Sequence, residues 1–331
     1  MTETRFDVLA IGDAVVDVIA SATDDFLAEE GLVKGSMRLL DTDQATRLYA
    51  RMGPARETSG GSAANTAAGI AALGGRAAFV GQVAKDQLGE VFRHDIKAHG
   101  VEFATAASKG GAPTGRCLIL VTPDAQRTMN TYPGAAHELS TASIDAEQIR
   151  AAAILYLEAY LWRAPLPREA MREAMEIAKG AGRKVAFTLS DIACIASHRA
   201  DIMELIDSGK IDILFANEAE VKALFEQGEL DAALAAARAR VPLLIVTCGE
   251  KGAVALDGGG LLSVPAAPAE RLVDTTGAGD LFAAGFLTAN ARGLPVEQCL
   301  RIGALAAAEI ISHYGARPEA DLKALIDGAL A

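Results

Sequence analysis

Short apolar runs alternate with segments of helical periodicity along most of the 331-residue chain. The alternation is most regular from residue 151 onward. There it predicts strands at 154–157, 184–189, 211–215 and 243–247, and helices at 168–179, 197–207, 218–225 and 231–240. Strand–helix alternation of this kind is typical of βαβ units, which build a parallel sheet covered by helices on both faces. A hairpin at 254–264 and three helices at 278–291, 296–312 and 320–330 are expected to follow.

The first 150 residues mix this pattern with purely β-type segments. Strands are expected at 6–11, 14–20, 34–40, 77–83, 117–121 and 127–131, and helices at 43–51, 66–73 and 86–99. The region 101–131 shows no helical pattern. We therefore expect one large α/β domain, formed by 1–12, 42–101 and 133–331, and a small accessory β-sheet formed by 13–41 and 102–132.

Composition excludes several classes of protein. The formal net charge is −12 and no Lys/Arg run stands out, which argues against a nucleic-acid-binding surface. The four cysteines lie far apart without CxxC spacing, as expected for reduced thiols. The N-terminus lacks the pattern of a signal peptide, and no apolar stretch reaches the ~18 residues of a membrane helix. These features predict a cytoplasmic protein that contacts no membrane.

Three familiar nucleotide-binding patterns are not present. The nearest approach to a P-loop, at 110–117, lacks the Lys and the following helix. The segment after the first strand, 12–17, does not fit the dinucleotide fingerprint GxGxxG. The motif set of protein kinases is missing as well. These absences argue against a P-loop enzyme, a Rossmann dehydrogenase and a protein kinase.

The segment 274–280, DTTGAGD, is the strongest candidate for chemistry. It leads into a predicted helix, and the unpaired N–H groups of a helix N-terminus, together with the helix dipole, favour a phosphate group. Asp280 would lie within reach of a hydroxyl that attacks this phosphate. Taken alone, the same residues also fit a plain capped turn.

Four motifs together decide between these readings. They are GGSAANTA (60–67), NEAE (217–220), TCGEKG (247–252) and DTTGAGDLFAAGFL (274–287). Their sequences, order and spacing resemble those of the ribokinase-like (PfkB) sugar and nucleoside kinases, and the resemblance covers essentially the whole chain. It implies a three-layer α/β/α domain with a β-sheet lid, a substrate between lid and sheet, and the use of ATP and Mg²⁺.

Within this family the segments 12–17 and 26–40 resemble the adenosine kinase branch. Asp13 stands where those kinases usually have Asn. The first hypothesis is thus an ATP-dependent kinase that phosphorylates the 5′-hydroxyl of adenosine, acting as a monomer or homodimer. The alternatives are a ribokinase or another sugar kinase, and a nucleotide-sensing binding protein without turnover. A nucleoside would need an apolar slot, for which Met37, Met129 and Tyr160 are candidates.

The catalytic assignment follows the requirements of phosphoryl transfer. Asp280 would act as general base toward the substrate hydroxyl. The N–H groups of Gly277, Ala278 and Gly279 would stabilise the charge on the transferred group. Arg127 resembles a lid arginine of adenosine kinases that could close on the phosphates, although a lone arginine can also be structural.

The remaining assignments concern binding. Asp17, Gly61, Asn65 and Asp13 are expected to hold the ribose, and Tyr160 could stack on a purine or belong to the core. Thr247, Gly249 and Gly252, with Asn217, fit a nucleotide site. Glu220 and Asn217 would position Mg²⁺ through water, unless Glu220 is merely solvated. Asp274 and Thr276 could form the K⁺ site that several relatives carry.

Overall fold

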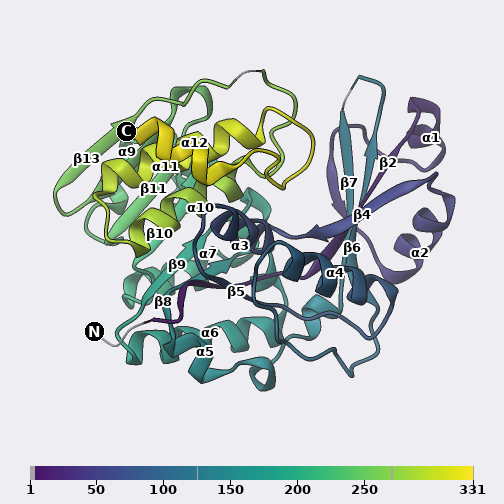
Figure 1. Cartoon of the computed structure of the whole chain (residues 1–331), viewed down its shortest axis with the longest axis horizontal. Helices are drawn as coiled ribbons and strands as arrows, with labels where there is room; N and C mark the ends of the chain where they lie inside the picture. Colours follow the sequence, from purple (N-terminus) through teal and green to yellow (C-terminus); the bar gives the residue numbers. More distant parts are fainter. Residues whose placement is uncertain (1–3, 125, 270, 331) are drawn as a thin grey trace.

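The computed structural model describes residues 4–124, 126–269 and 271–330. The strands of this part of the chain form two separate sheets, seen edge to edge in Figure 1. The larger sheet and its covering helices make up the left and centre of that view, and the smaller sheet stands to the right. The predicted α/β class with a second small sheet is confirmed.

The larger sheet has the order β13-β12-β11-β10-β9-β8-β1-β5. Its strands are β1 (Phe6–Ile11), β5 (Ala77–Val80), β8 (Ala152–Glu158), β9 (Lys184–Thr188), β10 (Ile213–Asn217), β11 (Leu243–Thr247), β12 (Ala253–Asp257) and β13 (Gly260–Val264). Pairing is parallel from β5 to β11, and the hairpin β12–β13 adds two antiparallel strands at one edge. The sheet is therefore mostly parallel, as predicted.

Helices cover both faces of this sheet. They are α3 (Ser62–Ala72), α5 (Ala146–Arg150), α6 (Pro165–Gly180), α7 (Ile192–Asp207), α8 (Glu218–Leu224), α9 (Leu230–Ala237), α10 (Ala278–Ala291), α11 (Val296–Ile310) and α12 (Leu322–Leu330). Helix α4 (Gln87–Ala98) packs mainly on strands of the smaller sheet. No helix in the described ranges is both long and apolar enough to cross a membrane.

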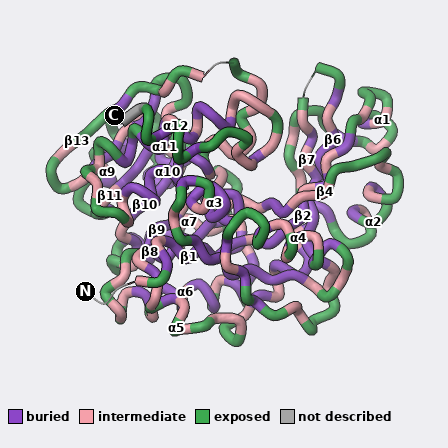
Figure 2. The backbone as a smooth tube through the Cα atoms, viewed as in Figure 1, coloured by how far each residue is buried: buried purple, intermediate pink, exposed green. Residues whose placement is uncertain are grey.

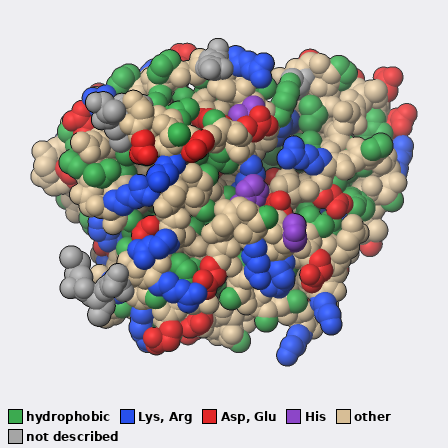
Figure 3. Space-filling view, in the orientation of Figure 1, with side chains coloured by type: hydrophobic (Ala, Val, Ile, Leu, Met, Phe, Trp, Pro, Cys, Tyr) green, Lys and Arg blue, Asp and Glu red, His purple; other side chains and the backbone are tan. Residues whose placement is uncertain are grey.

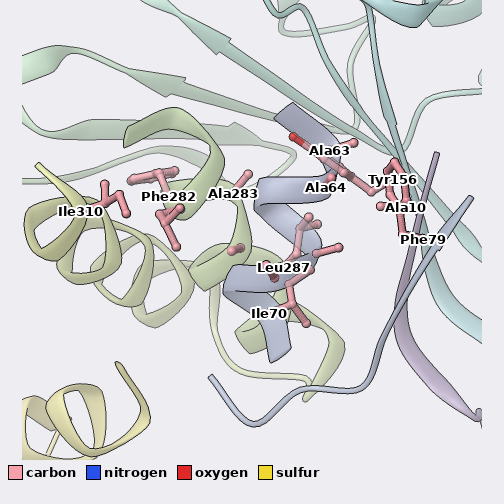
Figure 4. Packing of buried hydrophobic residues seen from close by; sticks show 14 of the residues in the cluster. Ala10, Ala63, Ala64, Ile70, Phe79, Tyr156, Phe282, Ala283, Leu287 and Ile310 are labelled. Atoms are coloured by element: carbon pink, nitrogen blue, oxygen red, sulfur yellow. The ribbon is translucent and has the colours of Figure 1, made fainter. Parts of the chain in front are cut away.

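Side chains alternate between the two faces of the sheet along each strand and contribute to two hydrophobic cores, one on each face. Val8, Ala10 and Tyr156 point toward α3, α10 and α11, whereas Leu9 and Leu157 point toward α6 to α9. Figure 4 shows α3 packed between α10 and the strands, with Ala63 and Ala64 close to the sheet. The strands appear as the continuous buried centre of the chain trace in Figure 2. This packing gives the predicted three-layer architecture.

The smaller sheet, called the small sheet below, has the order β3-β7-β6-β2-β4. Its strands are β2 (Val15–Ser21), β3 (Met37–Leu39), β4 (Ala55–Gly60), β6 (Thr114–Val121) and β7 (Arg127–Gly134), and helices α1 (Asp24–Glu29) and α2 (Thr42–Arg51) accompany it. Helix α2 begins at a capping box in which Asp41 and Gln44 satisfy each other's backbone N–H groups.

Two segments differ from the predicted division of the chain. Residues 42–60, assigned above to the large domain, lie with the small sheet: α2 packs on β6 and β7, and residues 55–60 form β4 and pair with β2. Residues 102–108, assigned to the accessory sheet, run along the larger body instead: Glu102 bridges to Ala78, and Phe103 packs against Phe79 and Phe92. The first segment lacks a clear apolar alternation, and the second owes its position to one aromatic cluster.

The helix after β4 also begins earlier than predicted. Helix α3 starts at Ser62, not at residue 66, and Gly61 occupies its N-cap with φ +96°. A side chain at this position would place its Cβ 2.1 Å from the backbone oxygen of Asp13, so only glycine fits. Asn65 consequently lies within the first turns of a helix, and its side chain has a fixed direction.

Candidate active site

A cavity of about 550 Å³ opens at the carboxyl ends of the parallel strands, between the two sheets. Open α/β sheets bind their ligands at this edge. Many of the predicted site residues line it: Asp13, Asp17, Gly61, Asn65, Tyr160, Asn217, Glu220, Thr247, Thr276, Gly277, Gly279 and Asp280. Arg127, Asp274, Gly249, Gly252 and Ala278 do not belong to its lining.

Both oxygens of the Asp280 carboxylate accept hydrogen bonds from side chains of helix α3. Ser62 Oγ donates to its Oδ1 at 2.7 Å, and Asn65 Nδ2 donates to its Oδ2 at 2.9 Å. Burial raises the pKa of Asp280, while the bonds from Asn65 and Ser62 and the charge of Arg317 oppose this rise. Each oxygen accepts one hydrogen bond and keeps a further lone pair, so the carboxylate is oriented and still able to accept a proton.

The turn before Asp280 exposes backbone N–H groups to the cavity. Gly277 adopts φ +79° at the N-cap of α10, where a Cβ would lie 2.8 Å from that of Ala316. Gly277 and Gly279 line the cavity. The N–H of Ala278 instead donates to Thr275 O at 3.2 Å, which ties up one of the three predicted donors within the turn. The N-terminus of a 14-residue helix thus faces the cavity through glycines.

Two further carboxyl groups, Asp17 and Asp13, lie at the start of the small sheet. Asp17 packs over Gly60, whose missing side chain leaves room for the carboxylate. Burial raises the pKa of Asp17 to about 6, although Arg317 and Arg127 pull it downward. Burial raises the pKa of Asp13 to about 7, and its Oδ1 is buried without a hydrogen-bond partner. A ligand hydroxyl or amine could supply the partner that this oxygen lacks.

Glu158, at the end of β8, organises the backbone around these groups. It is fully buried and accepts hydrogen bonds from the N–H of Asp13 and the N–H of Ala63, each at 2.6 Å. Burial and the neighbouring Asp13 raise its pKa well above the ordinary value. Gly12 packs so closely on Glu158 that a Cβ there would overlap its carboxyl group. The glutamate therefore joins the β1–β2 connection to the start of α3.

Asn217 and Glu220 form a second capping box at the start of α8. Asn217 Oδ1 accepts from the Glu220 N–H at 2.8 Å, and both Glu220 oxygens accept from Asn217. Among the described residues, no group of three His, Cys, Asp or Glu side chains could hold a metal ion directly. Mg²⁺ keeps most of its waters in such sites, so a single cavity-facing carboxylate fits the predicted water-mediated role.

The predicted nucleotide loop lies next to this cap. Thr247 ends β11 beside Asn217 and lines the cavity. Gly249 and Gly252 flank a short 3₁₀ turn, with φ of +58° and +96°. At Gly252 a Cβ would lie 2.1 Å from the backbone oxygen of Val264, so close packing of the backbone requires glycine at this position. Only Thr247 of the three thus faces the cavity itself.

Arg127 has a different partner from the one predicted. Its Nη2 lies 2.9 Å from Asp274 Oδ2, both side chains are only 8% exposed, and the guanidinium lies 5.7 Å from the ring centre of Tyr314. Asp274 also accepts hydrogen bonds from Thr276 and from the Gly315 N–H. The pair connects β7 of the small sheet to the turn before α10. It also places a cation at the carboxylate that was expected to bind K⁺.

One face of the small sheet gives the cavity an apolar wall. Alternate residues of neighbouring strands line it, among them Val15, Met37, Ile119 and Met129. Tyr160 borders the cavity from the larger body; its hydroxyl donates to Ser190 O at 3.1 Å, and Arg163 lies over its ring. Met37, Met129 and Tyr160, the candidates for an apolar slot, thus all line the same cavity.

Sequence reasoning did not identify three residues that hold the site. Ser62 lies within the glycine motif, and Glu158 directly follows the predicted strand 154–157. Arg317 lies in the loop between α11 and α12 and donates to Asn65, Ala64 and Ser59. No local pattern marks Glu158 or Arg317, because their partners lie between 95 and 258 residues away.

Comparisons with known proteins identify the family to which the chain belongs. The family model described as pfkB family carbohydrate kinase matches residues 38–322. Fructokinase-1 of Oryza sativa subsp. japonica is 32% identical over 236 residues, which cover 69% of this chain and 72% of that protein.

Two solved structures match over nearly their whole length. A probable sugar kinase from Rhizobium etli CFN 42 is 45% identical, and the adenosine kinase from Sinorhizobium meliloti is 47% identical. Each match covers 98% of this chain and 99% of the other, with a TM-score of 0.92. The family model thus covers most of the chain, and the sequence similarity to fructokinase-1 extends over more than two thirds of it. The chain belongs to the PfkB family of carbohydrate kinases.

Proposed function

We propose that this kinase transfers the γ-phosphoryl group of ATP to the 5′-hydroxyl of a ribonucleoside, with adenosine as its substrate. The observation that carries the proposal is the composition of the cavity. One cavity contains a held carboxylate, Asp280, a second carboxylate, Asp17, and an apolar wall from the small sheet. These three features correspond to the reacting hydroxyl, the ribose diol and the base of a nucleoside.

In this proposal, the small sheet contacts the nucleoside. Asp17 accepts hydrogen bonds from the two vicinal ribose hydroxyls, and Asn65 and the Gly61 backbone lie beside them. Met37 and Met129 pack against the base from one side, since unbranched thioether side chains adapt to flat apolar groups. Tyr160 contributes its ring from the larger body. A sugar would leave this apolar wall without a partner.

The reaction needs one proton acceptor and one anion site. Asp280 accepts the proton of the 5′-hydroxyl while that oxygen forms its bond to the γ-phosphorus. The bond from the γ-phosphorus to the bridging oxygen breaks, and ADP leaves with the electron pair. The N–H groups of Gly277 and Gly279 face the developing charge. A buried base with a raised pKa accepts a proton at neutral pH more readily than an exposed one.

The nucleotide is expected along Thr247, Asn217 and Glu220, at the other end of the cavity. When bound, Mg²⁺ neutralises part of the triphosphate charge, and Glu220 would orient it through water. K⁺ is not part of the proposal, because Arg127 already pairs with Asp274. The 47% identity to the adenosine kinase of Sinorhizobium meliloti supports the nucleoside assignment.

A substrate panel tests the acceptor. Purified protein with ATP and Mg²⁺ is offered adenosine, other ribonucleosides, ribose and fructose, and ADP release is measured together with the mass of the product. We expect adenosine to give the highest kcat/KM and a 5′-monophosphate. Turnover of fructose or ribose without nucleoside turnover would make the chain a sugar kinase, as the 32% identity to fructokinase would then suggest. Binding of ATP without any turnover would leave a nucleotide sensor.

The base is tested separately with Asp280→Asn. This variant keeps the shape and the bond from Ser62 but cannot take up the proton, so kcat should fall by about 10²–10⁴-fold. Asp231→Asn serves as a matched control, since it removes an exposed carboxylate from the first turn of another helix, α9. Wild-type rates in the Asp280 variant would contradict the assignment.

A further inference from the structure

Arg317 lies where three parts of the molecule meet. Its Nη1 donates to Asn65 Oδ1 at 2.7 Å and to Ala64 O at 3.2 Å. Its Nη2 donates to Ser59 O at 2.8 Å and to Ser59 Oγ at 2.9 Å. The loop after α11 thereby connects to helix α3 and to strand β4 of the small sheet. Four hydrogen bonds from one guanidinium exceed what a solvated loop arginine makes.

These bonds belong to a continuous chain with a defined direction. Ser59 Oγ donates its single proton to Asp95 Oδ2 at 2.6 Å, so it can only accept from Arg317. Asn65 accepts from Arg317 through Oδ1 and donates through Nδ2 to Asp280 Oδ2. An arginine cannot accept a hydrogen bond, and therefore it determines which end of the Asn65 amide faces Asp280. The opposite amide orientation would place two oxygens against each other.

We propose that Arg317 is a positioning residue for phosphoryl transfer, which fixes the Asn65 amide so that Asp280 is held in its proton-accepting orientation. The inference rests on the proposed role of Asp280 as the base. It adds a second consequence: strand β4 of the small sheet shares the same guanidinium, so the placement of that sheet and the orientation of the base are linked through one side chain.

The charges around Asp280 support the same assignment. Asp17 from β2, Glu158 and Tyr156 from β8, and Tyr160 beyond β8 face it, and each of these groups is neutral or negative. Ser62 and Asn65 of α3 contribute neutral donors. Arg317 brings a positive charge that lowers the pKa of both Asp280 and Asp17 against the effect of burial. Without it, ionisation of these neighbouring carboxyl groups becomes less favourable.

The test compares Arg317→Met and Arg317→Lys with the wild type and with Asp280→Asn. The Arg301→Met variant is the matched control, because that arginine is 53% exposed on α11 and pairs only with a surface glutamate among the described residues. The pH dependence of kcat/KM, the separate kcat and KM values for ATP, and the midpoint of thermal unfolding are measured for each, with the best acceptor found for the wild type.

We expect Arg317→Met to lower kcat by about 10- to 100-fold, because small misplacements of a reacting group cost this much. The KM for ATP should stay within about threefold, and the acid limb of the pH profile should move upward by about one pH unit. Arg317→Lys should return the acid limb toward the wild-type position while recovering only part of kcat, since one ammonium cannot hold Ser59 and Asn65 together. Arg301→Met should match the wild type.

Two results would overturn the proposal. One is a kcat within twofold of the wild type for Arg317→Met; the other is a lower rate with an unmoved acid limb and a proportionate fall in thermal midpoint, which indicates a structural role alone. If the Met variant does not fold, Arg317→Gln carries the same expectation for the acid limb. A wild-type rate in Asp280→Asn would instead refute the base itself, so the two failures are distinguishable.

Discussion

Asp17 offers a quantitative test, because the same carboxylate is expected to bind substrate and to destabilise the fold. Burial raises its pKa from 3.8 to about 6. Its carboxylate borders the cavity and packs over Gly60. The perturbation we consider is Asp17→Asn, which keeps the size of the side chain and removes its charge.

The magnitude follows from linkage between protonation and folding. A folded-state pKa above the unfolded one means that the folded protein binds more protons, so stability falls as pH rises from about 4 to about 6. The interval between 3.8 and about 6, at about 1.36 kcal/mol per pH unit, corresponds to about 3 kcal/mol. Above pH 6 the ionised Asp17 therefore costs about 3 kcal/mol of folding free energy, and below pH 4 it costs nothing. Asp17→Asn should remove this cost.

Equilibrium urea unfolding at pH 7.5 and at pH 4.5 measures the difference. We expect the variant to be more stable than the wild type by up to about 3 kcal/mol at pH 7.5, and by less than half of that at pH 4.5. Its KM for the nucleoside should rise at least tenfold, since an amide cannot accept from two hydroxyls as a carboxylate does. Glu173→Gln, at an exposed position of α6, controls for the loss of one charge.

The reasoning is refuted if the variant is no more stable than the wild type at pH 7.5, or if its advantage does not shrink at the lower pH. Either outcome would mean that Arg317 and Arg127 compensate fully for the burial of the charge. An unchanged KM would separately contradict the role of Asp17 toward the ribose.

Two further variants test how the site is assembled. Gly61→Ala should destabilise the fold by at least about 2 kcal/mol and abolish most activity, because φ is +96° and the new Cβ would lie 2.1 Å from a backbone oxygen. Gly258→Ala is the control, since the space around Gly258 is open. Equal unfolding curves for the two variants would contradict the steric argument. Arg127→Met should cost about 3 kcal/mol, since it leaves the nearly buried Asp274 without its cation. A double-mutant cycle with Asp274→Asn should recover more than half of this loss, and strict additivity in thermal or urea unfolding would show that the pair is not coupled.

Charge on the surface adds little to these arguments. On the face shown in Figure 3, Lys and Arg side chains lie among Asp and Glu side chains and do not form one stripe. The carboxylates of Asp17 and Asp280, on which the predictions depend, line the cavity instead.

Local pattern was sufficient for the order of most elements and for locating the turn that we propose as the reaction site. Alternating apolar strands and helices predict a parallel sheet because both periodicities are properties of short segments. The turn at 274–280 could be predicted for the same reason, since glycines at a helix start leave backbone N–H groups unpaired. The family resemblance was needed to favour a phosphate site over a plain capped turn at these residues. The structure adds that the Ala278 N–H is used within the turn.

Tertiary structure alone decided the boundary of the small sheet and the support of the base. Segment 55–60 has no clear alternation, and it becomes a strand because β2 offers an unpaired edge. Glutamate and arginine side chains, such as those of Glu158 and Arg317, are exposed to solvent in most proteins. Here the fold buries Glu158 completely and Arg317 in part. Glu158 can be accommodated only because two N–H groups from distant segments donate to it. Such partners follow from packing between segments far apart in the chain, which no window of residues contains.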